Sequence, residues 1–226
     1  MIQTKYLKYL LTMLFCCSIL TCSKNKWIVL FDGTSTDAWR GYQRQDFPSD
    51  GWKIENGSLK TIVGGDQCDI ITKEKYSDFE LDLEWRVAPG GNSGIFYRAT
   101  EDYPAMWQSA PEMQVLDDSL HPDGKNSKTS AGSLYDLIAP TNKVLRPVGE
   151  YNQVRILVQG NHVEHWLNGV KIVEYELGSE MLQSLIAESK FKDLSEFAKA
   201  KAGFIGLQHH GQEVWYRNIR IRTLRD

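Results

Sequence analysis

Hydrophobic and polar residues alternate strictly along one stretch of the chain. Apolar side chains occupy every second position, namely Phe79, Leu81, Leu83, Trp85 and Val87, and charged residues fill the gaps. A helix would spread these apolar groups around its circumference, so the pattern predicts a β-strand with one buried face. A glycine-rich turn over residues 89–94 and a short strand over 95–98 follow. We therefore expect a hairpin over residues 79–98, with Arg86 and Arg98 close to its bend.

Short runs of the same kind continue through most of the chain. Two Asn-Gly pairs, at 56–57 and 168–169, separate such runs, and this dipeptide favours two-residue β-hairpins. Further strands are predicted at residues 27–31, 52–54, 58–63, 112–116, 132–137, 153–159, 162–167, 170–175, 204–208 and 214–224. The polar stretch 117–130 is rich in turn-forming residues, which predicts a loop.

Helical spacing of apolar residues is confined to residues 178–201, which predicts one or two short helices inserted between strands. Many short strands without a βαβ spacing predict an all-β fold, a sandwich or jelly roll of two antiparallel sheets. The chain has 226 residues, 42% of them hydrophobic, which is enough for one such domain. We place this single domain at residues 27–226.

The N-terminus has the features of an export signal. Lys5 and Lys8 precede an apolar run over residues 9–20, which is short for a membrane span but suits a signal peptide. Ile-Leu-Thr-Cys at 19–22 resembles a lipobox, which predicts a leader over 1–22, a lipid on Cys22 and a tether over 23–26. A plain secretory signal is the alternative. The lipoprotein interpretation predicts an exported protein, periplasmic or anchored at the outer membrane by its lipid alone.

Composition excludes several classes of protein. Of the four cysteines only Cys68 follows the leader, so the mature domain can have neither an internal disulfide nor a cysteine zinc site. The net charge of −3 provides no basic surplus for nucleic acid. Seven tryptophans favour half-buried sheets and can also stack on sugar rings.

Three carboxylates on one face of the strand at 79–87 form the first candidate site. Glu80, Asp82 and Glu84 match the Glu-x-Asp-x-Glu pattern of retaining glycosidases with a sandwich fold. The outer two would lie about 13 Å apart at the backbone. Retaining glycosidases need roughly 5 to 5.5 Å between their carboxyl groups. The alternative interpretation is a solvated strand face whose charge Arg86 partly neutralises.

Two further groups of polar residues could take part in chemistry. Glu112 and Gln114 share one strand face, and Asp117 begins the following loop, so the three could converge at a sheet edge or simply be surface polar groups. Four histidines lie near strand ends in the last third of the chain, namely His162, His165, His209 and His210. Imidazoles there could act as base, acid or metal ligand.

Seven motifs in order carry a family resemblance. They are LFDG at 30–33, EWR at 84–86, GNSGIFYR at 91–98, EMQVLD at 112–117, EHWLNG at 164–169, GLQHHG at 206–211 and RNI at 217–219. Together they resemble the 3-keto-disaccharide hydrolase family, which has many exported Bacteroidetes members, over nearly all of residues 27–226. The resemblance implies a concanavalin-A-like jelly roll and a hydrolase or lyase that acts on glycosides oxidised at the 3-position.

A reaction scheme follows from that resemblance. A ketone at C3 acidifies the hydrogen on C2, so a base can remove it, the group on C1 can leave by β-elimination, and water can add back. Such a scheme needs a base, an electrophile for the enolate oxygen and an acid for the leaving oxygen. On the matching motifs we expect His165 or Glu112 as the base, His210 to assist proton transfer or bind a divalent metal ion, and Arg86 and Arg98 to hold the sugar or its enolate.

The expected sugar contacts are Asn92, Gln114, Asp117, Tyr135, Trp166 and Lys171. A divalent metal ion could polarise the ketone, although the spacing of the candidates does not identify its ligands. A non-catalytic, lectin-like sugar-binding module is an alternative function, because the same fold hosts lectins. A retaining glycosidase that uses Glu80 and Glu84 is the second alternative.

Overall fold

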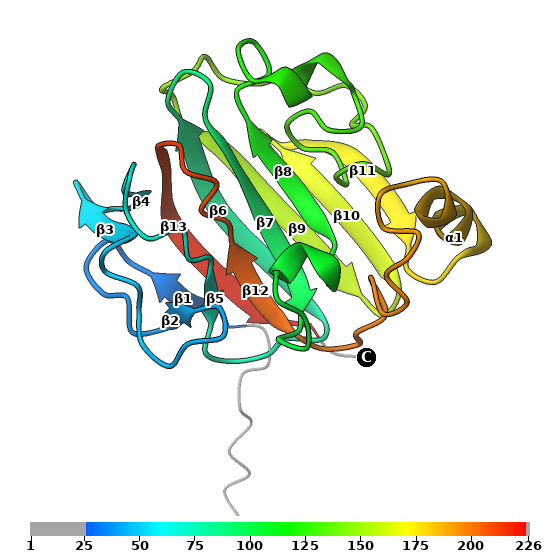
Figure 1. The fold of residues 1–226 in the computed structure, drawn as a ribbon, viewed down its shortest axis with the longest axis horizontal. Helices are drawn as coiled ribbons and strands as arrows, with labels where there is room; N and C mark the ends of the chain where they lie inside the picture. The colour runs from blue at the N-terminus through cyan, green and yellow to red at the C-terminus, as the bar shows by residue number, and fades with distance from the viewer. Residues whose placement is uncertain (1–25, 225–226) are drawn as a thin grey trace, which may run out of the picture.

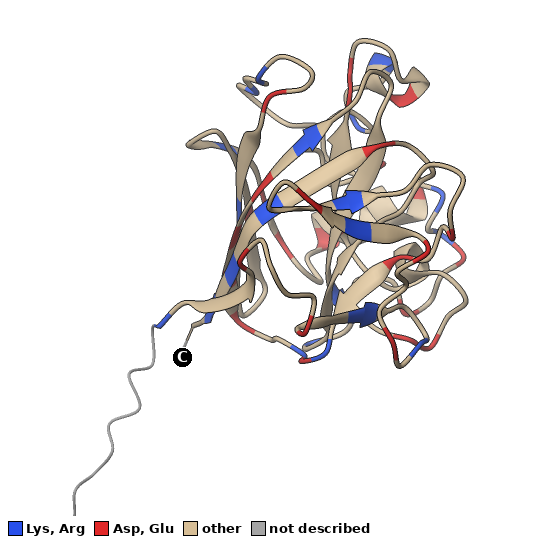
Figure 2. Cartoon of the chain, turned by 90° about the vertical axis from the view of Figure 1, so that its left-hand side faces the viewer, with Lys and Arg blue, Asp and Glu red and all other residues tan. Residues whose placement is uncertain are grey.

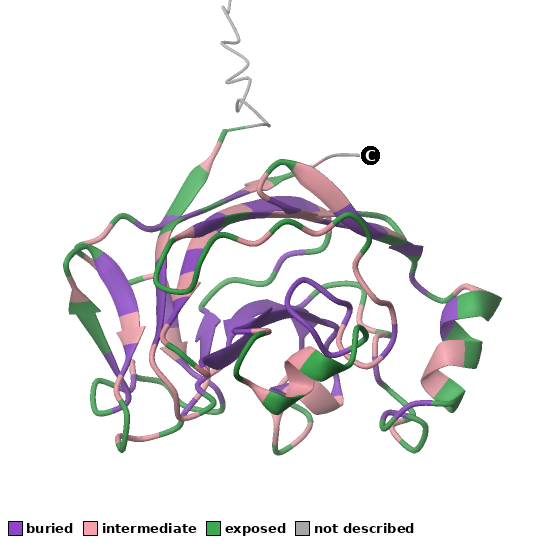
Figure 3. Cartoon of the chain, turned by 90° about the horizontal axis from the view of Figure 1, so that it is seen from above, coloured by how far each residue is buried: buried purple, intermediate pink, exposed green. Residues whose placement is uncertain are grey.

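Two antiparallel β-sheets stacked face to face make up most of the computed structural model, which describes residues 26–224 (Figures 1 and 3). Sheet A has the order β11-β10-β9-β6-β13-β4-β3, and β1 also pairs with β13. Its strands are β1 (Ile28–Phe31), β3 (Trp52–Glu55), β4 (Ser58–Thr61), β6 (Phe79–Val87), β9 (Asn152–Gln159), β10 (His162–Leu167), β11 (Val170–Glu176) and β13 (Val214–Thr223).

Sheet B is smaller and has the order β2-β5-β12-β7-β8. Its strands are β2 (Trp39–Gly41), β5 (Ile70–Thr72), β7 (Asn92–Ala99), β8 (Glu112–Leu116) and β12 (Phe204–Leu207). The described helices are α1 (Glu180–Ala187) and the single-turn 3₁₀ helices η1 (Met106–Gln108) and η2 (Pro122–Lys125). The all-β sandwich predicted from the sequence is therefore confirmed.

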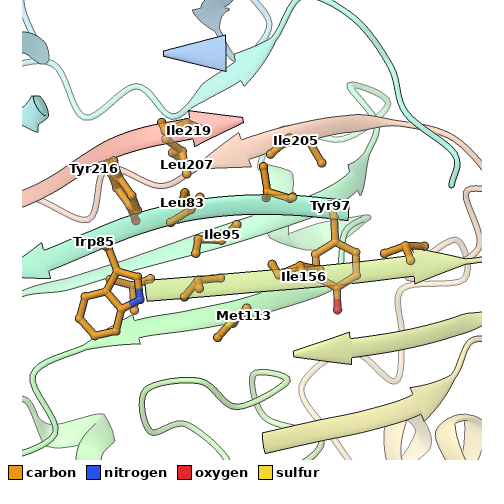
Figure 4. Close-up of a cluster of buried hydrophobic side chains, with 14 of the residues drawn as sticks. Leu83, Trp85, Ile95, Tyr97, Met113, Ile156, Ile205, Leu207, Tyr216 and Ile219 are labelled. Carbon is orange, nitrogen blue, oxygen red and sulfur yellow. The ribbon is translucent and has the colours of Figure 1, made fainter. Parts of the chain in front are cut away.

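The hydrophobic core fills the space between the two sheets (Figures 3 and 4). Leu83 and Trp85 reach it from β6, and Ile95, Met113 and Leu207 meet them from sheet B. The alternating pattern of β6 therefore buries the face that the sequence predicts. Because each strand alternates, the neighbours of these core residues point to the outer faces of the sheets.

The two strands of the segment 79–98 exist, but the expected hairpin between them is wrong. Strand β6 lies between β9 and β13 in sheet A, whereas β7 lies between β12 and β8 in sheet B. The glycine-rich stretch after Val87 carries the chain from one sheet to the other. Alternation predicts a strand and its buried face, but it does not identify the strand's partner.

Both Asn-Gly hairpins are confirmed, joining β3 to β4 and β10 to β11. Residues 132–137 are not a strand, since they contribute only isolated bridges at Leu134. The short strands β2 and β5 were not predicted. In the insert, α1 accounts for the first half of the helical pattern, and turns connect most of residues 188–201.

The carboxylates of β6 face outward and are paired across the sheet, as expected for a solvated face. Glu80 pairs with Arg222, Asp82 with Arg220 at 2.6 Å, and Glu84 with Arg217 at 2.6 Å. Acidic and basic positions are interspersed on this side of the molecule (Figure 2). Each carboxylate therefore already has a cationic partner from β13.

The predicted leader, its lipidation site Cys22 and most of the tether lie outside the described residues and stay predictions. Cys68 is a buried free thiol, and such a thiol packs as a small apolar side chain. None of the helices within residues 26–224 is long and apolar enough to cross a membrane.

Candidate active site

A row of polar residues crosses the outer face of sheet B. Ile95, Met113 and Leu207 point into the core, so their neighbours Gly94, Gln114 and Gln208 point outward. Gly94 pairs with Gln114 in the ladder, and the Gln208 N–H donates to the Gly94 carbonyl at 3.0 Å. A glycine at the middle of this row leaves space above the sheet.

The Glu112 carboxyl group fills the space above Gly94. A Cβ atom on Gly94 would overlap Glu112 Oε1, so the carboxyl lies directly over the glycine backbone. With its amide turned to satisfy both neighbours, Gln114 donates to the Ser93 carbonyl at 2.9 Å and to Glu112 Oε1 at 3.2 Å. Glu112 is only 6% exposed. Burial raises the pKa of this carboxyl, which makes its ionised form a stronger base than an ordinary glutamate.

A second carboxyl group, that of Asp69, belongs to the same face. Its Oδ1 accepts the backbone N–H of His209 at 2.8 Å. Burial raises the pKa of Asp69 to about 6, and the Asp69 charge further raises the pKa of Glu112. Two carboxyl groups whose pKa values are both raised are typical of catalytic sites.

The ammonium group of Lys190 sits among aromatic rings, and one of them belongs to Tyr135, whose backbone N–H donates to the Glu112 carbonyl at 3.0 Å. Its Nζ lies 4.1 Å from the centroid of the Tyr135 ring and 5.1 Å from those of Trp107 and Phe191. The backbone N–H of Lys190 donates to Asp136 Oδ2 at 3.1 Å, which fixes the residue after α1. Although the side chain is exposed, partial desolvation lowers the pKa of Lys190, and the Glu112 charge acts against that shift.

Two imidazoles complete the cluster. The rings of His121 and His210 are 6.2 Å apart between centroids and meet edge to face. His121 Nδ1 accepts the Asp123 N–H at 3.2 Å, and its Nε2 lies 3.3 Å from the Asn92 amide nitrogen. His210 donates through Nδ1 to Gln212 Oε1 at 3.2 Å. His121 therefore approaches Asn92, which lies two residues before Gly94 on the same outer face of β7.

We call this set the sheet B cluster: Asp69, Asn92, Glu112, Gln114, His121, Tyr135, Lys190 and His210. Contacts connect its members, because the Tyr135 hydroxyl donates to Asp123 Oδ2 at 3.3 Å and His121 lies in the same loop. A buried base, a cation and two imidazoles are the groups that a proton-abstraction reaction uses.

A family model described as a 3-keto-alpha-glucoside-1,2-lyase-like domain matches residues 26–222. The chain belongs to this family. A relative from Bacteroides thetaiotaomicron, named 3-keto-disaccharide hydrolase, is 38% identical over 228 residues, which cover 88% of this chain and 78% of that protein. The family predicted from the seven motifs is therefore confirmed.

Solved structures agree on the fold of this lyase-like domain. A crystal structure from Parabacteroides distasonis, assigned as a glycosyl hydrolase, matches with a TM-score of 0.81 and 28% identity, covering 88% of this chain and 94% of that one. A Bacillus subtilis protein with a galectin-like fold matches with a TM-score of 0.50 and 11% identity over 82% of this chain and 94% of that one, which supports the fold alone. The jelly-roll prediction is confirmed.

Five of the predicted site residues lie together in the sheet B cluster: Asn92, Glu112, Gln114, Tyr135 and His210. The structure places the other six elsewhere. Strand alternation was sufficient for Glu112 and Gln114, because both follow from the single outer face of β8.

His165 lies in the core and not with Glu112 and His210, contrary to its expected place as a base that contacts the sugar. The side chain is 0% exposed. Its Nδ1 donates to the Gly132 carbonyl at 3.3 Å, and its Nε2 accepts the Tyr97 hydroxyl proton at 2.8 Å. His165 occupies the inward face of β10, and no substrate can contact it there. Burial lowers the pKa of His165 to about 4.

We expect His165→Gln to change the pH dependence of stability and to leave turnover intact. Between the ordinary histidine pKa of 6.5 and the folded value of about 4, the unfolded chain binds a proton that the folded chain does not. Stability therefore falls as the pH falls through this window. At pH 5 the loss relative to pH 7 is about 2 kcal/mol. Denaturant unfolding at both pH values should show this difference shrinking by that amount in His165→Gln.

The prediction fails if the wild-type pH dependence of stability survives in His165→Gln. A folded variant without turnover would instead restore His165 as the catalytic base.

Arg86, Trp166 and Lys171 lie on the outer face of sheet A, away from the sheet B cluster. The Arg86 guanidinium stacks on the Trp215 ring at 4.2 Å, and Trp166 Nε1 donates to Glu164 at 2.7 Å. Lys171 pairs with the same Glu164 at 3.1 Å. These three residues, expected as sugar contacts, do not join the sheet B cluster because their strands belong to the opposite sheet.

Arg98 and Asp117 hold the backbone in place. The Arg98 guanidinium donates to the carbonyls of Ser77 and Gly160 at 3.0 and 2.8 Å, and it is 5% exposed. Asp117 Oδ2 accepts the Gly90 N–H at 2.8 Å, at the crossover between the sheets. Neither side chain is directed at the sheet B cluster, contrary to expectation.

Three members of the cluster were missed: Asp69, His121 and Lys190. His121 falls in the stretch predicted as a loop, and Lys190 falls in a segment with helical spacing, so neither has a strand pattern that would direct it to a site. Asp69 precedes β5, a strand that was also missed. The HHG part of the motif at 206–211 did locate His210.

The predicted divalent metal ion remains a prediction. Within residues 26–224, one group has histidine and carboxylate atoms close enough to share an ion: His162, Glu164 and Glu174, whose ligand atoms lie within 4.8 Å of one another. This group is on the outer face of sheet A. Lys171 already neutralises it, since its Nζ is 3.1 Å from Glu164 and 2.6 Å from Glu174.

Proposed function

We propose that the chain cleaves glycosides whose sugar is oxidised to a ketone at C3, with Glu112 as the base that removes the C2 proton. The chain is a glycoside-cleaving, carbohydrate-active enzyme by its family. The proposal adds that the substrate is a 3-keto sugar, and the relative from Bacteroides thetaiotaomicron named 3-keto-disaccharide hydrolase supports this. The observation that carries the proposal is the buried Glu112 carboxyl held above Gly94.

Glu112 suits proton removal from carbon for electrostatic reasons. The hydrogen on C2 is only weakly acidic even beside a ketone, so the base must have a raised pKa and be held close to that carbon. Burial raises the pKa of Glu112, and the space above Gly94 lets its carboxyl lie at the surface of sheet B, where C2 of a bound sugar can approach it. Of the two bases expected from the sequence, Glu112 is the one on an outer face, since His165 is enclosed in the core.

The proposed reaction begins with proton transfer from carbon to Glu112. Glu112 takes the C2 proton, and the electron pair of that bond moves into the C2–C3 enolate. The enolate then expels the group on C1, whose oxygen takes a proton from one of the paired imidazoles, His121 or His210. Water adds across the resulting double bond and gives net hydrolysis. His210 is exposed at the rim of the cluster, so the group that leaves C1 would pass close to it on its way to solvent.

A 3-keto-glucoside with a chromogenic leaving group tests the function directly. We expect the purified protein to release the chromophore from the ketone and to leave the unoxidised glucoside intact. Reactions in D₂O should place deuterium at C2 of the product. A parallel reaction with a chelator shows whether a divalent metal ion takes part.

Two results would overturn this function. Binding of the ketone without turnover would favour a lectin-like module. Cleavage of the unoxidised glucoside, abolished by Glu84→Gln, would favour a retaining glycosidase that uses Glu80 and Glu84.

A further inference from the structure

The sheet B cluster contains a base and proton donors, but the arginines expected to stabilise an enolate lie elsewhere. Removal of the C2 proton leaves a negative charge on the C3 oxygen. Without a nearby cation or hydrogen-bond donor, that charge would raise the barrier steeply. Some other group on the outer face of sheet B must therefore serve as the electrophile.

Among residues 26–224, no carboxylate pairs with the ammonium group of Lys190. Of its polar groups only the backbone N–H is hydrogen-bonded, to Asp136 Oδ2, and none of the ion pairs found among residues 26–224 includes its Nζ. Surface lysines normally extend freely into water. The Lys190 ammonium instead rests against the rings of Tyr135, Trp107 and Phe191, whose π-faces attract a cation.

The surroundings hold this ammonium in position. Phe191 stacks on Phe197 with centroids 4.0 Å apart, and Ser189 Oγ donates to the Ile186 carbonyl at 2.9 Å. These contacts fix the segment that follows α1, so the aromatic cage is formed before any substrate binds. A prepositioned cation costs little reorganisation when charge develops near it.

Lys190 also interacts electrostatically with Glu112, since each charge favours the ionised form of the other. Before proton transfer, the negative charge beside the ammonium is on the Glu112 carboxylate. After transfer, Glu112 is neutral and the enolate oxygen carries the charge. If that oxygen lies near Nζ, Lys190 faces one negative charge throughout the step.

The geometry points to Lys190 as the electrophile of the reaction: its ammonium binds the C3 oxygen of the substrate and stabilises the enolate that forms when Glu112 removes the C2 proton. This inference rests on the proposed function. It assigns to the insert over 178–201 a catalytic role, because Lys190 reaches the site from that insert and from no strand of either sheet.

Replacement of Lys190 by methionine tests the assignment. Methionine keeps most of the apolar contact with the rings but removes the charge. We expect kcat to fall about 10²- to 10³-fold, the usual loss when one oxyanion-stabilising group is removed. Lys190→Arg should recover part of that loss. Lys192→Met, two residues away on the exposed surface, should leave kcat within about twofold of wild type.

A second readout separates catalysis from a merely structural role. In D₂O, a 3-keto sugar that lacks a leaving group on C1 should exchange its C2 hydrogen in the presence of wild-type protein. We expect Lys190→Met to slow this exchange by the same factor as turnover, at an unchanged melting temperature.

The possible failures are distinguishable. A wild-type protein that neither cleaves nor exchanges 3-keto substrates refutes the proposed function itself. An active wild type with an equally active Lys190→Met refutes only the role of Lys190. Trapping of a substrate on Lys190 by cyanoborohydride also overturns the proposal, because it would indicate a covalent imine in place of an ion pair.

Discussion

Glu112→Gln is expected to lower kcat/KM on a 3-keto-glucoside by roughly a thousandfold, within the range typical for loss of a general base. Glutamine has nearly the shape of the protonated glutamic acid, so it should keep the packing over Gly94 while being unable to take a proton. Purified variant and wild type are compared by release of the leaving group and by deuterium exchange at C2. Both rates should fall together, because both depend on the same proton transfer.

The pH profile provides a further check on the same residue. Because burial raises the pKa of Glu112, the carboxylate is depleted at a higher pH than for an ordinary glutamate. The kcat/KM of wild type should therefore rise with pH through that raised pKa and not level off near pH 5. Measurements of kcat/KM against pH for wild type and Lys190→Arg, made in the same buffers, show whether this rise occurs.

Glu84→Gln is the matched control for Glu112→Gln. Glu84 lies on the outer face of sheet A and pairs with Arg217, so its loss should leave kcat/KM within about twofold of wild type. Comparable losses in the two variants would contradict Glu112 as the base.

Gly94→Ala is expected to remove most activity and to destabilise the fold by about 1–3 kcal/mol, as overpacking usually does. The backbone of Gly94 does not have a positive φ, so alanine fits it without strain. The cost arises instead because the added methyl group overlaps Glu112 Oε1. To relieve that overlap, the carboxyl must leave the position from which it would reach the C2 hydrogen.

A double-mutant cycle isolates this cause. In a Glu112→Ala background the carboxyl is gone, so Gly94→Ala should cost far less stability than in wild type. Denaturant unfolding of the four proteins at one pH measures the difference. Equal costs in both backgrounds would show that Gly94 matters for some reason other than the space that Glu112 occupies.

The sequence could predict strands and faces but not sheet membership. Alternation in β6 correctly assigned Leu83 and Trp85 to the core and the charged residues between them to an outer face. It could not show that β6 and β7 belong to different sheets, because a polar glycine-rich connection suits a hairpin as well as a crossover. Isolated bridges at Leu134 and the three-residue strand β5 carry too short a pattern to be predicted reliably.

Because alternation does not assign a strand to a sheet, the sequence identified only some of the site residues. Glu112 and Gln114 share the outer face of β8, so predicting that strand was enough to group them. Arg86 and Trp166 also lie on outer faces, but of the opposite sheet, and alternation does not distinguish two outer faces. Lys190 joins the site through contacts with Tyr135 and Trp107, which are distant in the chain, and no local pattern indicates such contacts.

The place of β13 in the middle of sheet A has a consequence for folding. This strand follows every other described strand in the chain, yet it pairs with β1, β4 and β6. During synthesis the edges of β1, β4 and β6 that pair with β13 therefore stay unpaired until the last segment of the chain has been made. Such distant pairings give a high contact order and slow folding, and they leave exposed edges that a chaperone can protect until the sheet closes.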